Sequence, residues 1–352
     1  MFLLLACTQA NDTATPEPEG LSVLGQGSHS VEEVQFDQLA DDGDGLAEPR
    51  DLAFNPKAPG ELWIVNRATN GVTILFDAGT AEQSSTSFVG SAHFLAQPSA
   101  LAFGDNGAFA TSQEEDEKTQ GPNGTPADFM GPTLWTGDSS IFNGQHESHL
   151  DMLHNSPNAA GIAWEEDNTY WVFDGWNEAL TRYAFHGDHD LGGTDHSDGE
   201  LARYVEGEVS YSPDVPSHMV YDPASALLYV ADSGNGRVAA LDTTTGERDG
   251  TVGPNYDGTT QVDMRDASLV TLVGAGEFGM GEPSGIALVD DILFVTDIST
   301  GNILAFDLDG ELVDWMDTGL GSGALMGIEA DESGNLYVVD AVDDAVYRIS
   351  PL

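Results

Sequence analysis

The chain has 352 residues, and its 10 lysines and arginines stand against 60 aspartates and glutamates, which gives a formal net charge of −50 at pH 7. Such a charge repels the phosphates of nucleic acids and of anionic lipid headgroups, and this excludes both as binding partners. An acidic surface of this kind is typical of a halophilic or marine bacterium, because salt screens its self-repulsion. A dedicated cation-binding function is the alternative interpretation.

The N-terminus carries the only cysteine. Residues 1–7 end in Leu-x-Ala-Cys, which resembles the lipobox of bacterial lipoproteins and implies that Cys7 is lipidated after a truncated signal. The positively charged start of a signal peptide is missing, so either the start codon is placed too late or the N-terminus is short and cytosolic. Residues 8–30 have the polar composition of a flexible tether. We expect an outer-membrane lipoprotein of the cell envelope that touches the membrane only through this anchor.

One cassette recurs along the rest of the chain, residues 31–352. A strand of small and apolar residues leads through a polar turn into an apolar strand, then into a Gly/Asn-rich turn and a further strand. Its six copies begin at Pro49, Pro98, Pro157, Pro216, Pro283 and Gly327. Repeats of roughly 40–50 residues, each a few short strands, are the signature of a propeller. We therefore predict an all-β, six-bladed β-propeller whose last blade is completed by an N-terminal strand at Val31–Phe36.

One segment carries a family resemblance. Residues 231–238 read Ala-Asp-Ser-Gly-Asn-Gly-Arg-Val, which resembles the signature of the NHL-repeat family of six-bladed propellers. The resemblance extends over about residues 30–352 and is strongest in the last three cassettes. It implies the same fold, but the family includes both protein-binding scaffolds and enzymes, so the function stays open.

In a propeller the innermost strands begin around one mouth of the central channel. The cassettes place Arg50, Asn158 and His218 at this mouth, with Trp176 in a neighbouring turn. Four aspartates end the second strands nearby, namely Asp174, Asp232, Asp297 and Asp340. They are candidate ligands for Ca²⁺ or for a cationic molecule. The alternative is that each aspartate accepts hydrogen bonds from its own turn.

Two histidines are candidates for chemistry in the channel. His218 starts an inner strand, and His154 precedes another, so either is a possible metal ligand or base. Residues 216–219 are similar to a segment of peptidyl-α-hydroxyglycine α-amidating lyases, which implies a three-histidine zinc site. The chain departs from that pattern because no other inner strand starts with His. Ser233 stands where those lyases have a catalytic arginine, and Arg50 is the candidate substitute.

The second polar cluster lies between residues 186 and 199. Half of this segment is His or Asp, namely His186, Asp188, His189, Asp190, Asp195, His196 and Asp198. Carboxylates favour Ca²⁺, whereas imidazoles favour Zn²⁺ or Cu²⁺. The segment connects the third and fourth strands of blade three, so we expect a site on the face opposite His218 and separate from the channel. A solvated polar hairpin is the alternative.

Two functional hypotheses follow from these features. The first is an envelope-anchored, monomeric propeller that binds a small molecule, a peptide or an envelope protein and is stabilised by divalent cations. The second is a metal-dependent lyase or hydrolase with its site at the channel mouth around His218, with Arg50 as a further catalytic candidate. Three convergent histidines would favour the second hypothesis, and the sequence offers His218 and His154.

Overall fold

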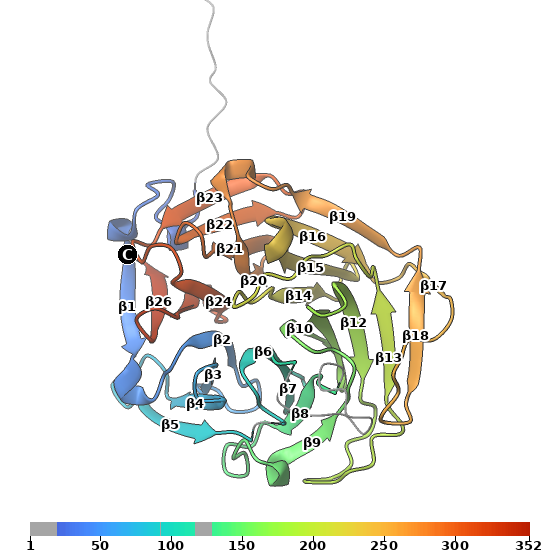
Figure 1. Ribbon diagram of the computed structural model, residues 1–352. Coiled ribbons are helices and arrows are strands. Elements are labelled where there is room, and N and C mark those ends of the chain that lie inside the picture. Colours follow the sequence, from blue (N-terminus) through green and yellow to red (C-terminus); the bar gives the residue numbers. More distant parts are fainter. Residues whose placement is uncertain (1–19, 92, 117–128) are drawn as a thin grey trace, which may run out of the picture.

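The computed structural model describes residues 20–91, 93–116 and 129–352. Cys7 and residues 8–19 of the expected tether lie outside these ranges. The described chain forms six blades around a central axis, which confirms the predicted all-β six-bladed propeller (Figure 1). Within the described ranges, no helix has the length and apolar character needed to cross a bilayer.

Each of the first three blades steps outward from an innermost strand. Blade one consists of β2 (Pro49–Phe54), β3 (Leu62–Asn66), β4 (Gly71–Phe76) and β5 (Ser84–Val89). Blade two consists of β6 (Pro98–Phe103), β7 (Ala108–Gln113), β8 (Thr133–Thr136) and β9 (His149–Met152). Blade three begins with β10 (Ala159–Glu166), β11 (Thr169–Asp174), β12 (Ala179–Ala184) and β13 (Glu200–Tyr204).

The last three blades repeat this order. Blade four consists of β14 (Met219–Asp222), β15 (Leu227–Asp232), β16 (Arg237–Asp242) and β19 (Ser268–Val273). Blade five consists of β20 (Pro283–Val289), β21 (Ile292–Asp297), β22 (Asn302–Asp307) and β23 (Leu312–Asp317). Blade six consists of β24 (Leu325–Ala330), β25 (Leu336–Asp340), β26 (Ala345–Pro351) and β1 (Val34–Ala40).

Helical structure is restricted to short 3-10 turns in the described part of the chain. They are η1 (Ser22–Leu24), η2 (Val31–Glu33), η3 (Asp42–Asp44), η4 (His146–Ser148), η5 (Ser233–Asn235) and η6 (Glu277–Gly279). The sequence predicts this scarcity, because it contains no long segment of helical period with caps.

The N-terminal strand closes the ring. Strand β1 pairs antiparallel with β26, from Val34 opposite Pro351 to Ala40 opposite Val346. The predicted closing strand was placed at 31–36, and the observed strand begins later because residues 31–33 form η2. The hydroxyl of Ser30 accepts a hydrogen bond from the backbone N–H of Glu32 and so caps this turn. Closure removes the exposed strand edges that an open ring would leave.

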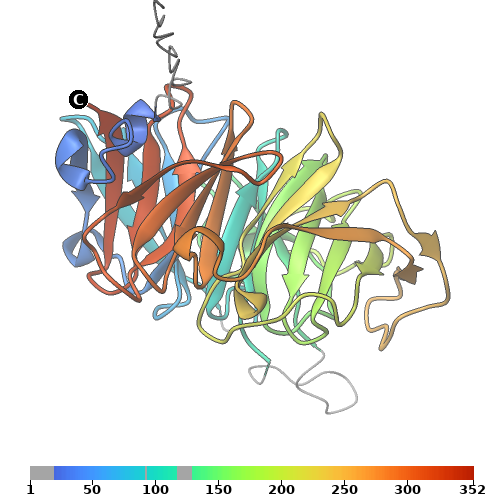
Figure 2. The ribbon, with the colours of Figure 1, turned by 90° about the horizontal axis from the view of Figure 1, so that it is seen from above.

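Blade three is wider than the repeat predicts. The connection from β16 to β19 contains β17 (Glu247–Arg248) and β18 (Thr260–Arg265), which cross to blade three. Strand β18 pairs parallel with β13, from Glu200 opposite Thr260 to Tyr204 opposite Met264. Figure 2 shows these strands at the outer edge of the disc. They cover the edge strand of blade three with backbone hydrogen bonds.

The core lies between successive blades, where neighbouring sheets pack face to face. Trp63 of blade one and Phe109 of blade two are fully buried, with ring centroids 5.0 Å apart at a steep angle. Such edge-to-face pairs add about 0.5–1.5 kcal/mol to the burial of the rings. The inner strands are therefore held from both sides, which fixes the side chains that face the channel.

Candidate functional site

The channel wall is built from equivalent positions of the six inner strands. Asp51 pairs with Val65, the residue before the end of β3, and the carbonyl of His218 accepts from the N–H of Ala231, the residue before the end of β15. Asp51 and His218 therefore occupy one position of the repeat. The other four blades carry small residues there, namely Ala100, Gly161, Gly285 and Gly327. Two titratable side chains therefore lie in a layer of the channel wall in which the other four residues are alanine or glycine.

The next inward-facing layer carries a third titratable group. Glu329 pairs with Tyr337 in blade six. The residues at the same position of the other blades are small and apolar, namely Ala53, Ala102, Ala163, Val220 and Ala287. The three polar side chains therefore come from three different blades and face a common space.

These two layers border a cavity of about 400 Å³ in the channel. Apolar side chains of all six inner strands line it, including Leu101, Ile162 and Ile286. Its carboxyl groups are those of Asp51, Asp105 and Glu329, and its histidine is His218, whereas no lysine or arginine is among the described residues that line it. Apolar walls with a few converging polar groups are typical of small-molecule sites.

The cavity is closed at the end where the inner strands begin. There the guanidinium of Arg50 lies 3.4 Å from the sulfur of Met326, and Nε2 of His218 lies 3.1 Å from the carbonyl oxygen of Ser99. All four residues are buried. The lining also includes Phe54 and Trp164 near the opposite ends of their strands. The cavity therefore opens on the face where the inner strands end, opposite the expected mouth.

Burial controls the protonation of the channel groups. It raises the pKa of Asp51 to about 8, although the Leu101 N–H donates to this carboxyl at 3.0 Å. Burial, with a smaller contribution from the charge of Asp51, raises the pKa of Glu329 to about 7. It lowers the pKa of His218 to about 4. The 3.7 Å contact between Nδ1 of His218 and Asp51 is therefore a contact of neutral groups at pH 7.

The aspartates at the ends of the second strands are held by their own turns. Asp297 accepts from the N–H of Ser299 at 2.9 Å, and Asp340 accepts from those of Val342 and Asp343. Asp174 bonds to Asn177, and Asp232 bonds to Asn235 and Arg237. Within the described ranges, these four carboxylates do not belong to any group of converging metal-ligand atoms.

The other residues expected at this mouth also lie apart. The side chain of Asn158 bonds to Asp116 at 3.3 Å, and Trp176 is 51% exposed. Neither residue lines the channel cavity.

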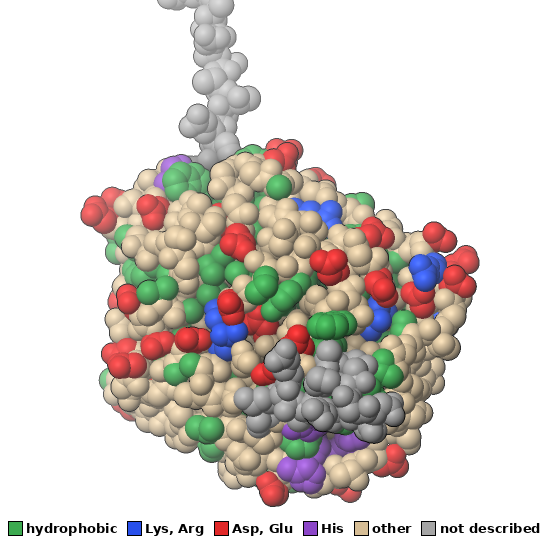
Figure 3. All heavy atoms as spheres, viewed as in Figure 1, with side chains coloured by type: hydrophobic (Ala, Val, Ile, Leu, Met, Phe, Trp, Pro, Cys, Tyr) green, Lys and Arg blue, Asp and Glu red, His purple; other side chains and the backbone are tan. Residues whose placement is uncertain are grey.

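A second polar cluster lies at the rim, between blades two and three. The segment 186–199 runs along the edge strand β9, with the His189 N–H donating to the Leu150 carbonyl at 3.2 Å and the Gly192 N–H to that of His149 at 3.0 Å. The segment therefore extends blade two as well as connecting strands of blade three. In the space-filling view of Figure 3, histidine side chains gather at one place on this rim.

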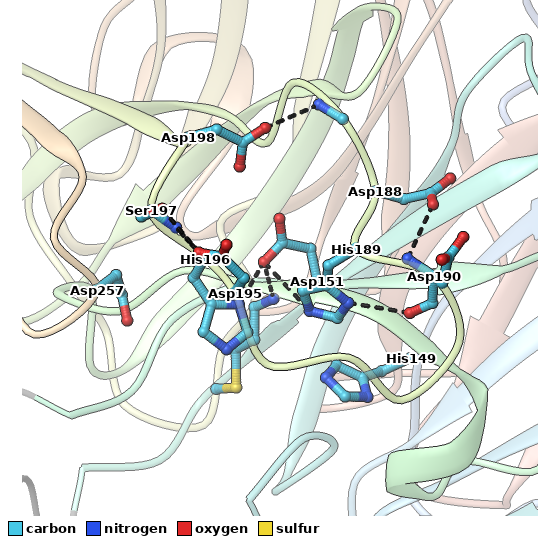
Figure 4. A network of polar contacts seen from close by, with 12 residues as sticks. His149, Asp151, Asp188, His189, Asp190, Asp195, His196, Ser197, Asp198 and Asp257 are labelled. Atoms are coloured by element: carbon cyan, nitrogen blue, oxygen red, sulfur yellow. Dashed lines mark hydrogen bonds and ion pairs between the residues drawn. The ribbon is translucent and has the colours of Figure 1, made fainter.

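Asp151 of β9 lies at the centre of this cluster (Figure 4). Its Oδ1 lies 2.6 Å from Nδ1 of His196 and 3.7 Å from Nε2 of His189. One ligand atom from each of these three residues lies within 4.8 Å of the other two. The other members of the segment point elsewhere: Asp188, Asp195 and Asp198 bond to nearby backbone groups, and His186 is exposed.

His154 belongs to the rim and not to the channel. Its Nδ1 lies 2.7 Å from Asp257, and its ring stacks on Phe129 with centroids 4.0 Å apart. Both His154 and His196 line a cavity of about 300 Å³ at the rim. Sequence position alone placed His154 near the channel, but the chain runs outside blade three before β10 begins.

Sequence reasoning missed Asp51, Glu329 and Asp151, although signals for them were present. Aligning the repeats by strand pairing, and not by their leading prolines, would have put Asp51 level with His218. Glu329 lies at a position of the repeat where the other five blades have a small apolar residue. Asp151 is two residues from His149, and such residues project from the same face of a strand.

Comparisons with known proteins support the fold. No protein-family model matches the chain, and no curated protein matches it in sequence. Among solved structures, an auxiliary nutrient binding protein from Bacteroides ovatus is similar with a TM-score of 0.56 at 14% identity, covering 93% of this chain and 75% of that one. A luciferin-regenerating enzyme gives 0.55 at 13% identity, covering 91% and 96%. Virginiamycin B lyase from Staphylococcus aureus gives 0.51 at 13% identity, covering 91% and 99%. At these identities the likeness is one of fold.

Proposed function

We propose that this propeller is a binding protein whose channel takes a small, largely apolar molecule that carries a protonated amine. The observation that carries the proposal is the composition of the 400 Å³ cavity, whose described lining contains three carboxyl groups and one histidine but no lysine or arginine, within largely apolar walls. These carboxyl groups have no cationic partner among the described lining residues, and an ammonium group on the ligand would supply one. The net charge of −50 favours the approach of cations.

The chemistry of recognition follows from the raised pKa values of the carboxyl groups. Without a cationic partner, Asp51, with a pKa of about 8, is mainly protonated at neutral pH, and Glu329, with a pKa of about 7, is about half protonated. A bound ammonium favours their ionised forms, so binding releases protons. Affinity therefore increases with pH up to about the pKa of Asp51, because above it the carboxyl no longer has to lose a proton.

The test compares a cationic probe with a neutral probe of the same shape. We expect phenethylamine to bind and phenethyl alcohol to bind at least about 10-fold more weakly, as one lost charged hydrogen bond predicts. Titration calorimetry in buffers of different ionisation enthalpy measures the released protons. Glu329→Gln should weaken phenethylamine binding and reduce proton release, whereas Glu332→Gln, an exposed acid of the same blade, should change neither. Equal binding of the two probes would overturn the proposal.

A second candidate is acid–base catalysis in the same cavity. It is favoured by the pKa values of Asp51 and Glu329, since an acid with a pKa near the working pH transfers protons well. The three-histidine zinc site implied by the lyase resemblance does not fit, because His218 is the only histidine among the described lining residues and its Nε2 faces the Ser99 carbonyl. Turnover of a probe, lost in Asp51→Asn, would favour an enzyme over a binding protein.

We also propose that a lipid on Cys7 anchors the propeller as a monomer to the cell envelope. The Leu-x-Ala-Cys sequence supports this proposal. The described chain begins at the outer edge of blade five, where the Leu21 N–H donates to Asp314 at 2.7 Å, so a tether would leave from the rim. Labelling with radioactive palmitate, absent in Cys7→Ser, is the expected result.

A further inference from the structure

The rim cluster offers a metal site that is independent of the channel. We propose that Asp151, His189 and His196 bind one Zn²⁺ ion, which joins the segment 186–199 to strand β9 of blade two. The three residues come from two blades and already place one ligand atom each within 4.8 Å of the others. No ion is needed to bring them together, because the segment docks on β9 through backbone hydrogen bonds.

Two buried polar atoms in the cluster have no hydrogen-bond partner. Oδ2 of Asp151 and Nε2 of His189 are both unpaired, although the Asp151 side chain is fully buried and the His189 side chain is 6% exposed. Leaving such buried atoms without a partner destabilises the folded protein. A cation bound between the Asp151 carboxylate and His189 would give the buried Nε2 a partner.

The hydrogen bonds of His189 set its ring for metal binding. Its Nδ1 lies 3.0 Å from the carbonyl oxygen of Asp190, so Nδ1 carries the proton and donates it. Nε2 of the neutral ring therefore presents a lone pair to the Asp151 carboxylate 3.7 Å away. Two acceptors that face each other in a buried site repel unless a cation lies between them. A carbonyl that fixes the outer ring nitrogen is also the usual support of a metal-binding histidine.

The donor set selects the class of metal. Two imidazoles and one carboxylate suit Zn²⁺, whereas Ca²⁺ requires six to eight oxygen ligands. His196 hydrogen-bonds to Asp151 through Nδ1 at 2.6 Å, so binding through this atom replaces the proton of that bond. His196 also lines the 300 Å³ cavity, which leaves space for a water as fourth ligand.

The test uses the full chain after treatment with a chelator and its removal. Titration with ZnCl₂, followed by calorimetry and by metal analysis after gel filtration, should give one zinc per chain. His189→Ala, His196→Ala and Asp151→Asn should each weaken binding by at least about 100-fold. His186→Ala is the matched control, because His186 belongs to the same segment but is exposed, and it should bind as the wild type does.

Cobalt substitution reads the ligand geometry directly. Co²⁺ in a site with nitrogen ligands and low coordination number gives strong visible absorption, which His189→Ala should abolish while circular dichroism shows an intact fold. The proposal is overturned if the wild type retains no zinc, if the His189→Ala/His196→Ala double variant retains one equivalent, or if Ca²⁺ displaces Zn²⁺ at equal concentration.

Discussion

The channel and the rim place polar side chains in two different ways. In the channel, Asp51, His218 and Glu329 stand on inner strands of three blades, and each strand is held by neighbours on both sides. At the rim, Asp151 stands on the edge strand β9, and its two histidine partners arrive on a connecting segment. Ring closure therefore fixes the channel geometry, whereas the rim geometry depends on the docking of one segment.

This difference separates the energetics of the two sites. Asp51 and His218 in the channel are mainly neutral at pH 7, because burial disfavours their charged forms. The rim retains unpaired buried atoms, and it gains stability when a cation supplies their partner. We expect the rim to respond to metal and the channel to respond to packing and to the titration of Asp51.

Metal binding should increase the stability of the protein through the rim alone. Zinc at 100 times its dissociation constant should raise the free energy of unfolding by about 2.7 kcal/mol over the chelated protein. Urea denaturation with zinc or with chelator measures this difference. It should vanish in His189→Ala and persist in Asp51→Asn. A zinc effect that depends on Asp51 would break the separation of the two sites.

Packing should matter more in the channel than at the rim. A Cβ on Gly161 would lie 1.9 Å from the Ser217 carbonyl oxygen, so Gly161→Ala forces two inner strands apart and should cost about 1–3 kcal/mol. At the rim, a Cβ on Gly187 would meet only a carboxylate oxygen of Asp198 at 3.5 Å. Gly187→Ala should stay within about 0.5 kcal/mol. If urea denaturation showed the same loss of unfolding free energy in both variants, packing would not matter more in the channel than at the rim.

The pH dependence of stability should identify Asp51. Its folded pKa of about 8 is above the ordinary value of about 3.9, so its contribution to stability is complete below pH 4 and is lost as the pH rises to 8. Between these pH values the free energy of unfolding of the wild type should fall by up to about 1.4 kcal/mol per pH unit relative to that of Asp51→Asn. Denaturation at pH 5, 6 and 7 measures the slope. Asp188→Asn, at an exposed site on the rim, should show the same pH dependence of the unfolding free energy as the wild type.

The smallest effect should come from Trp176. This side chain is 51% exposed on the face opposite the cavity opening. Trp176→Ala should change the unfolding free energy by less than about 0.5 kcal/mol and should leave phenethylamine binding unchanged. Weaker binding in this variant would show that the ligand enters from the closed end of the channel.

The sequence was sufficient to predict the fold because every blade repeats the same local signals. Each of the six copies has a proline or glycine before a strand of small residues, and a polar turn before an apolar strand. Strand β1 completes the ring as expected. It was not sufficient for the width of blade three, because β18 pairs with a strand of the preceding blade. Such parallel pairing leaves no local pattern.

The sites were less predictable because they depend on register and on long connections. His218 was identified, but its true neighbour Asp51 required the pairing of β2 with β3. In the segment 186–199, the composition indicated metal binding, whereas the third member of the cluster, Asp151, lies 38 residues before His189. His154 was assigned to the wrong region because the chain before an inner strand crosses the outside of the disc.

The insertion that carries β17 and β18 makes the blades unequal parts of the ring. Its Asp257 accepts a hydrogen bond from the backbone N–H of His154 at 2.8 Å, so a connection of blade four forms a wall of the cavity between blades two and three. A deletion within this one connection would change the surroundings of a histidine that belongs to another repeat. Blades of this propeller therefore cannot be exchanged or shortened as independent modules, and the rim cavity would evolve as a unit that spans three of them.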